Sequence, residues 1–206
     1  ANTLVYTLLN RPNVNAYLLA AKSLLRFAEP QTSLALVVQD DGTLSSQCIE
    51  RLHKHLPGID VLACSASHAA IQSALDELPG LRNVVPDVRS RHSLVPIYFK
   101  LLNVLVRYPG RQVIQIDSDI LFIRRPEFIL NWATSPDVDA FHSDGGSTVS
   151  SHFKELGLDD GPVSIDRFNS GVFGFVNRFS LDSVTPLFER LAKCQHDIYL
   201  KWDVEQ

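Results

Sequence analysis

The feature that most constrains this fold is the stretch VIQIDSDILF at residues 113–122. Its apolar, β-rich start predicts a buried strand of a parallel sheet covered by helices. Ligands gather at the carboxyl ends of strands in open α/β sheets. Residues i and i+2 of an extended segment point the same way, so the carboxylates of Asp117 and Asp119 should reach one hard cation. Mg²⁺ or Mn²⁺, completed by substrate phosphates, suits such ligands. The alternative is an ordinary turn, which Asp and Ser also favour.

Composition narrows the class of protein. The chain has 206 residues, 45% of them hydrophobic and 20% charged, as expected for one soluble globular domain. A net charge of −4 gives no sign of nucleic-acid binding. No apolar run approaches the roughly 18 residues of a membrane span.

Cysteine usage and the first residue bear on the compartment. The chain has three cysteines, Cys48, Cys64 and Cys194, which are far apart and odd in number, a pattern that fits a reducing compartment. We therefore expect a cytoplasmic protein. The sequence begins at Ala1 and contains no Met, so we also expect the natural start, with any targeting segment, to be missing.

Hydrophobic periodicity predicts alternating strands and helices. Strands are expected at residues 4–9, 33–38, 59–62, 138–141 and 170–176, with a central strand that starts at residue 113 and runs into Asp117 and Asp119. Helices are expected at residues 14–27, 44–52, 68–78, 94–107 and 181–194, with a short one after Arg125-Pro126. This alternation predicts a single α/β domain with a mostly parallel central sheet and helices on both faces. The long polar loop at residues 142–164 is expected to be either functional or disordered, and in the first case its Gly145-Gly146 segment would order as a lid when a ligand binds.

Further motifs complete a resemblance. The stretch TLLN at residues 7–10 is followed by Tyr17, and FNSGVF occupies residues 168–173. With the Asp-Ser-Asp motif, these resemble the nucleotide-sugar glycosyltransferases of the A-type fold. The closest resemblance is to the retaining, glycogenin-like family. It covers essentially all 206 residues and implies one nucleotide-sugar glycosyltransferase domain, 1–206.

The resemblance assigns roles on the donor side. It implies that the nucleoside is held by the end of the first strand and the following helix, through Thr7, Leu8, Asn10 and Tyr17. It places Arg91 and Lys100 near the phosphates and the sugar, where Arg89 could substitute for Arg91. A diphosphate needs cationic partners in place before reaction, which agrees with this assignment. Two solvated surface cations are the alternative.

The resemblance also assigns the metal and sugar contacts. It implies that Asp117 and Asp119 bind a divalent cation, Mn²⁺ or Mg²⁺, and that Ser118 between them contacts the substrate. It implies that Asn169 faces the transferred sugar, with Ser170 and Gly171 beside it. Glycine in a strand often marks close backbone approach. An ordinary turn into a strand would also explain Asn-Ser-Gly.

The end of the chain departs from the family pattern. Asp203, Glu205 and Gln206 resemble the family's acidic-Gln signature near the sugar, but the sequence stops there. The family's third metal ligand, a histidine, would lie further on, and neither His142 nor His152 matches it. We therefore expect the domain to lack its C-terminal segment.

Together these features predict a metal-dependent hexosyltransferase. The donor is expected to be a nucleotide-sugar, with UDP the family's usual carrier, and the acceptor a glycan, a lipid or a protein. Transfer with retention is what the resemblance implies. Lys100 would stabilise the leaving diphosphate, and Asp203 or Glu205 the positive anomeric carbon.

Three alternatives remain open. A haloacid-dehalogenase-type phosphatase also places two aspartates after a strand, but it needs a threonine where Leu121 stands. A nucleotidyltransferase shares the sheet and the acidic site, but no Gly-rich loop follows the first strand. A non-catalytic module binding carbohydrate or nucleotide-sugar on a degenerate transferase fold is the third.

Overall fold

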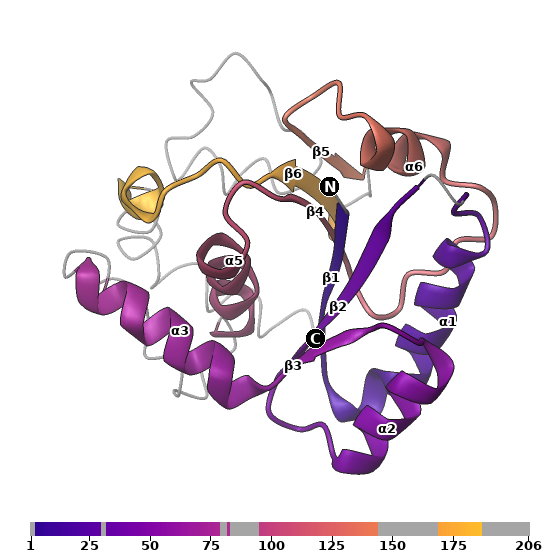
Figure 1. Ribbon diagram of the computed structural model, residues 1–206, viewed down its shortest axis with the longest axis horizontal. Helices are drawn as coiled ribbons and strands as arrows, with labels where there is room; N and C mark the ends of the chain where they lie inside the picture. Colours follow the sequence, from indigo (N-terminus) through magenta and orange to yellow (C-terminus); the bar gives the residue numbers. More distant parts are fainter. Residues whose placement is uncertain (1–2, 30–31, 79–81, 83–94, 144–168, 187–206) are drawn as a thin grey trace, which may run out of the picture.

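The computed structural model describes residues 3–29, 32–78, 82, 95–143 and 169–186. They form one six-stranded sheet in the order β3-β2-β1-β4-β6-β5 (Figure 1). The strands are β1 (Thr3–Leu9), β2 (Leu34–Asp40), β3 (Asp60–Leu62), β4 (Gln112–Ile116), β5 (Ala140–Ser143) and β6 (Asn169–Val176). Neighbours from β3 to β4 pair in parallel, whereas β6 pairs antiparallel with both β4 and β5. The mostly parallel sheet predicted from the sequence is confirmed.

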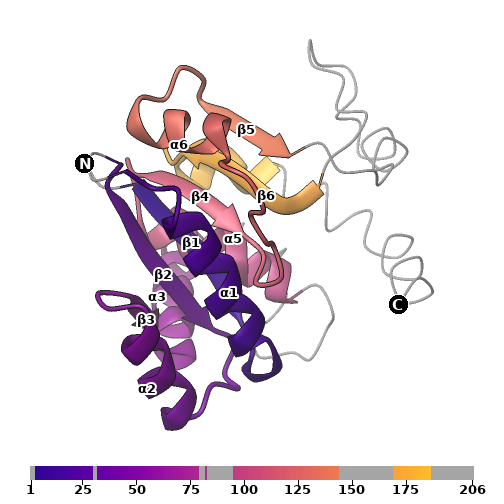
Figure 2. The same ribbon diagram turned by 90° about the vertical axis from the view of Figure 1, so that its right-hand side faces the viewer.

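Helices cover both faces of this sheet, as predicted. They are the 3-10 helix η1 (Arg11–Asn13), α1 (Val14–Leu25), α2 (Ser46–His55), α3 (Cys64–Glu77), α5 (Val95–Arg107) and α6 (Glu127–Thr134). Figure 1 shows α1 and α2 on one side of the strands and α3 and α5 on the other. In Figure 2, α6 lies beside β5 and β6, above the parallel strands. A helix also begins at Leu181, and its expected continuation beyond Pro186 lies outside the described residues.

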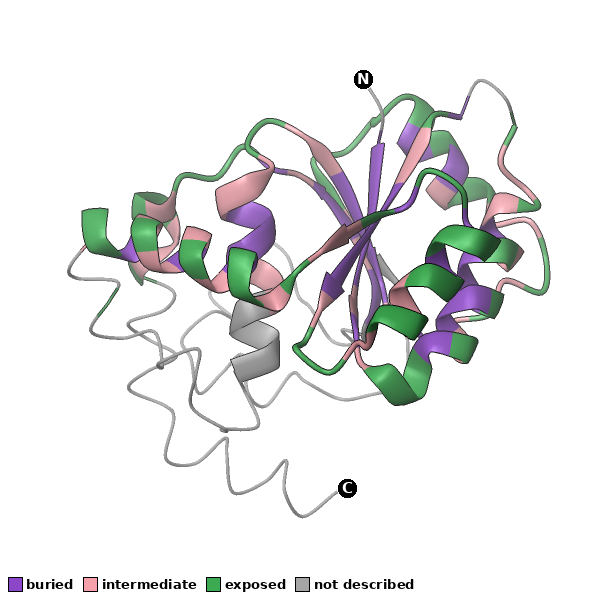
Figure 3. Ribbon diagram, turned by 60° about the horizontal axis from the view of Figure 1, so that its bottom comes forward, coloured by how far each residue is buried: buried purple, intermediate pink, exposed green. Residues whose placement is uncertain are grey.

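Two apolar clusters explain why the helices settle on these faces. On one face, Tyr17, Leu52 and Trp132 bring α1, α2 and α6 against β1 and β4. On the other, Val104 and Leu105 of α5 pack against the opposite side of the same strands. Figure 3 shows the result: the strands are largely buried, and the helices expose their outward sides. Burial on both faces is what the continuous apolar runs of a parallel strand require.

Tight packing between β5 and β6 makes Gly174 a site of strong steric constraint. A Cβ on Gly174 would overlap Cε1 of Phe141 and lie 2.6 Å from Cζ of the same ring. The Phe141 ring is itself held edge-on by Trp132, with centroids 4.9 Å apart, and by Phe128, at 5.2 Å. The ring therefore has little room to give way to an added methyl group.

Gly174→Ala should consequently destabilise the protein. Overpacking of this kind costs about 1–3 kcal/mol of unfolding free energy. Urea unfolding followed by circular dichroism measures the loss. Shortening the opposing ring with Phe141→Leu in the Gly174→Ala background should recover part of it. An unchanged unfolding midpoint in Gly174→Ala would show that the ring moves freely.

Candidate active site

The carboxyl ends of the parallel strands define the edge at which the predicted site residues gather. β1 and β4 are adjacent and parallel, with Tyr6 opposite Gln115, so Leu9 and Ile116 end at the same edge of the sheet. The Thr7 hydroxyl ties the two ends together by donating to the Ile116 carbonyl at 2.9 Å. This is the edge where ligands bind in open α/β sheets.

The two aspartates follow β4 in a turn, which corrects the predicted geometry. β4 ends at Ile116, directly before Asp117, and the Ile120 amide donates to the Asp117 carbonyl at 3.3 Å. Ser118 is buried, whereas Asp119 is exposed. The argument that both carboxylates share a face because the segment is extended therefore does not hold. Asp117 and Asp119 still lie one residue apart at the functional edge.

Lys100 contacts Asp117 directly. Its Nζ lies 2.5 Å from Asp117 Oδ1, and the two side chains are 15% and 38% exposed. Lys100 is carried by α5 and Asp117 follows β4, so the pair joins a helix to the sheet edge. A partly enclosed ammonium here supplies fixed positive charge where an anionic ligand would bind. The fold thus brings Lys100 to the Asp-Ser-Asp motif, and its role toward a donor stays a prediction.

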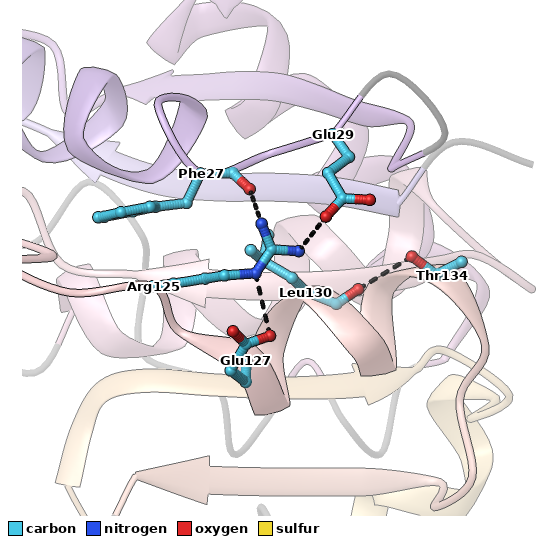
Figure 4. Close-up of polar contacts among 6 residues, drawn as sticks. All are labelled: Phe27, Glu29, Arg125, Glu127, Leu130 and Thr134. Atoms are coloured by element: carbon cyan, nitrogen blue, oxygen red, sulfur yellow. Dashed lines mark hydrogen bonds and ion pairs between the residues drawn. The ribbon is translucent and has the colours of Figure 1, made fainter.

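The chain leaving the Asp-Ser-Asp turn is fastened to the end of α1. The Phe122 amide donates to Ser23 Oγ at 3.0 Å. Arg125 then donates to the Phe27 carbonyl at 2.9 Å, to Glu29 at 2.7 Å and to Glu127 at 3.0 Å (Figure 4). The next helix, α6, begins at Glu127 and closes with Thr134 Oγ1 donating to the Leu130 carbonyl. These contacts fix the position of the segment that follows the Asp-Ser-Asp turn.

The predicted nucleoside contacts at the end of β1 have structural partners. Thr7 is fully buried and Leu8 is half-buried. Asn10 is also half-buried, and its Oδ1 accepts from the Asn13 amide at 3.1 Å, which caps η1. Thr7 therefore acts in this structure as a tie between strands, whereas Leu8 and Asn10 keep surface at the edge.

Tyr17 lies in the core rather than at a surface. Its side chain is 0% exposed, and among the described residues its hydroxyl has no hydrogen-bond partner. Burial raises the pKa of the Tyr17 hydroxyl above its ordinary value. Tyr17 is buried because it belongs to the row of apolar residues on the side of α1 that packs against the sheet. In this conformation its ring is closed off from a nucleoside.

The Asn-Ser-Gly segment runs beside the Asp-Ser-Asp turn. β6 begins with Asn169 and Ser170, and its Val172 pairs with Ile116 of β4. The Gly171 carbonyl accepts from the Asp117 amide at 2.8 Å. The backbone of the predicted sugar-facing segment is thus fixed directly against the first aspartate.

Four predicted site residues lie outside the described residues. These are Arg91, Asp203, Glu205 and Gln206. The predicted lid segment, Gly145-Gly146, also lies outside them.

The carboxylate groups at this edge of the sheet suit a divalent cation. Asp117 and Asp119 offer the carboxylate oxygens that Mg²⁺ and Mn²⁺ prefer. Within the described residues, no group of three or more His, Cys, Asp or Glu side chains could hold a metal. Two carboxylates nevertheless fit a cation of this class, because Mg²⁺ characteristically completes its shell with water and substrate phosphates.

Comparison by sequence finds no match, whereas comparison by structure finds several solved proteins with a similar fold. No protein-family profile and no curated protein matches the chain. The bifunctional glycosyltransferase WbbM superposes with a TM-score of 0.61 at 14% identity, over 93% of this chain and 35% of WbbM. The galactosyltransferase LgtC, solved with donor and acceptor sugar analogs, gives 0.57 at 18% identity, over 93% of this chain and 65% of LgtC. Core-mannan synthase A from Aspergillus fumigatus, in its Mn/GDP form, gives 0.53 at 10% identity, covering 97% and 66%.

These structures share the A-type glycosyltransferase fold, and this chain has that fold as well. The particular closeness to glycogenin-like enzymes stays a prediction. The chain spans about a third of WbbM and just under two thirds of the other two enzymes. In the part of the chain that the structure describes, no helix has the length and apolarity needed to cross a bilayer.

Sequence reasoning missed the polar residues that hold α5 in place. Asn103 and Asn177 are both essentially buried, at 0% and 1% exposure. Asn103 offered no signal, because helical spacing puts it on one ridge with the polar residues Lys100 and Arg107. Asn177 offered none, because asparagine after a strand is ordinary turn chemistry.

Proposed function

We propose that this protein is a metal-dependent glycosyltransferase. It transfers a sugar from a nucleotide-sugar, with UDP as the carrier, to a glycan, lipid or protein acceptor, with retention of configuration. The observation that carries the proposal is the Lys100–Asp117 contact at the carboxyl edge of β4 in an A-type fold. Support also comes from the Mn/GDP form of core-mannan synthase A and from the sugar analogs bound to LgtC.

The chemistry follows from the charges at this edge. Sugar transfer passes through an oxocarbenium-like transition state in which the anomeric C–O bond opens. A divalent cation held by Asp117 and Asp119 would neutralise charge on the leaving diphosphate. Lys100 adds a preorganised positive charge that needs no rearrangement during the reaction. Arg91 would reinforce it, and Asp203 or Glu205 would stabilise the developing positive charge on the sugar.

The sugar and acceptor roles complete the proposal. Asn169 and Ser170 would contact the sugar, and Gly171 would keep the backbone close to it. Gln206 would lie near the reacting carbon. The leaving phosphate can take the acceptor's proton when the new bond forms on the same face, so no protein base is required there.

Calorimetric titration of UDP tests the proposal, first with Mn²⁺ and then with EDTA. Binding is expected only with the metal. Asp119→Asn should abolish that binding while leaving the fold intact, because Asp119 is exposed and removal of its charge leaves no buried partner unsatisfied. Asp139→Asn is the matched control, since Asp139 is an exposed carboxylate that pairs with Arg178. Wild-type affinity for UDP and Mn²⁺ in Asp119→Asn would remove Asp119 from the site.

A non-catalytic nucleotide-sugar-binding module is the second candidate. The observation in its favour is that the described residues include no third protein ligand beside the two aspartates. Metal-dependent UDP binding without hydrolysis or transfer from any UDP-sugar would identify this alternative.

A further inference from the structure

The position of Lys100 depends on how α5 is held. Lys100, Asn103 and Arg107 are spaced three and four residues apart, so they form one ridge along the helix. Lys100 reaches Asp117 at the sheet edge. Arg107, at the other end of the ridge, donates to the Ala66 carbonyl of α3 at 2.7 Å. Asn103 lies between them, one helical turn from Lys100.

Asn103 is bonded to two strands at once. Its Nδ2 donates to Tyr6 OH of β1 at 3.0 Å and to Gln39 Oε1 of β2 at 2.8 Å. Its Oδ1 accepts from Arg107 Nε at 3.1 Å. Gln39 Oε1 also accepts from Ser67 Oγ of α3 at 2.5 Å. One amide thereby links α5 to both strands and, through Gln39, to α3.

The whole cluster is sealed from water. Tyr6, Gln39, Ser67 and Asn103 are each 0% exposed. Both amide hydrogens and the carbonyl oxygen of Asn103 have partners, so any rotation or sliding of α5 would leave buried polar groups unpaired. Apolar side chains tolerate such slippage, whereas a buried amide with fixed partners sets register. The sheet therefore fixes both the rotation and the height of α5 through Asn103.

We propose that Asn103 is the positioning residue that aims Lys100 at Asp117 and the donor phosphates. The inference rests on the proposed function, which it extends to the interior of the fold. Because α5 is a continuous helix, a displacement at Asn103 carries Lys100 with it. A misplacement of about 1 Å can cost a catalytic site about a hundredfold in rate.

The test compares Asn103→Leu with Val104→Ala, a matched core change in the same helix at 0% exposure. Leucine fills similar space without the amide. Loss of one hydrogen bond between a charged group and its partner, here Lys100 and a donor phosphate, is worth about a factor of ten, so Asn103→Leu should raise the Kd for UDP in the presence of Mn²⁺ about tenfold. Val104→Ala should leave that Kd nearly unchanged. In a Lys100→Met background Asn103→Leu should add no further loss, because its effect acts through Lys100.

A ligand-free measurement separates this inference from the proposed function. Trace acetylation should modify Lys100, which is 15% exposed and ion-paired, several-fold more slowly than the exposed Lys54. Asn103→Leu should remove that protection, and Val104→Ala should keep it. Failure of the wild-type protein to bind UDP with Mn²⁺ would overturn the proposed function alone. Retained protection of Lys100 in Asn103→Leu, or an equal loss of UDP affinity with and without Lys100, would overturn the positioning role.

Discussion

Asp117→Asn is expected to eliminate Mn²⁺-dependent UDP binding while the protein remains folded. The substitution keeps the size of the side chain and an oxygen that can accept from Lys100, but removes the charge that attracts a cation. Lys100 then stands as an uncompensated positive charge 2.5 Å from the position of the former carboxylate. Two unit charges 4 Å apart interact by about 4 kcal/mol near a protein surface. Attraction is thus replaced by repulsion, and a loss of more than about a hundredfold in Mn²⁺ affinity follows.

A second variant isolates the part played by Lys100. Calorimetry with Mn²⁺ and UDP should show no binding in Asp117→Asn, and partial recovery in the Asp117→Asn, Lys100→Met pair, because the repelling ammonium is gone. Lys54→Met, which removes an exposed lysine on α2, controls for the change in net charge. Equal binding in Asp117→Asn and in the wild-type protein would show that the cation is held elsewhere.

Particular residues show why the fold was predictable and parts of the site were not. The mostly apolar runs at residues 4–9 and 113–116 predicted buried strands, because a strand covered by helices on both faces is apolar along most of its length. With residues 113–116 predicted as a strand, Asp117 was expected at the carboxyl edge of the sheet, where open α/β sheets bind ligands. The turn from Asp117 to Ile120 was only the alternative prediction, because Ile120 and Leu121 continue the β-rich pattern beyond it. Local propensity cannot show where pairing partners for a strand run out.

Tyr17 and Asn103 show two limits of periodicity: the first was predicted at a ligand site but lies in the core, and the second is polar but has buried partners. Tyr17 was predicted at the nucleoside from its position in a motif, yet its spacing with Leu18, Ala21 and Leu24 equally predicts the core. Asn103 shares a helical ridge with Lys100 and Arg107, which indicates a polar face, and only the fold supplies Tyr6 and Gln39 as its buried partners. Periodicity states which face is buried, but not which buried polar groups find partners across the core.

Asn177 carries the other large expected effect, this time on stability. It is 1% exposed, and its Nδ2 lies 2.8 Å from the Tyr108 carbonyl, 3.0 Å from that of Val104 and 3.3 Å from that of Leu105. The Val104 carbonyl also accepts from the Tyr108 amide at 3.1 Å, and the Tyr108 carbonyl from the Arg111 amide at 3.2 Å, so the side chain of Asn177 adds a donor to those bonds and supplies one to the Leu105 carbonyl at the end of α5. The Asn177 carbonyl also accepts from the Gly110 amide, in the turn where that glycine adopts a φ of +73°.

Asn177→Leu should therefore lower the free energy of unfolding by about 1–3 kcal/mol, since the Leu105 carbonyl loses its side-chain donor while the carbonyls of Val104 and Tyr108 keep only their backbone donors. Asn131→Leu, at an exposed position on α6, should change it by no more than about 0.5 kcal/mol. Asn177→Asp distinguishes capping from packing. At neutral pH its carboxylate would face the negative end of the α5 dipole and several carbonyl oxygens, so it should destabilise more than leucine does. Urea unfolding at equal ionic strength measures all three variants. An aspartate variant more stable than the leucine variant would mean that side-chain volume, rather than donation to α5, is what Asn177 contributes.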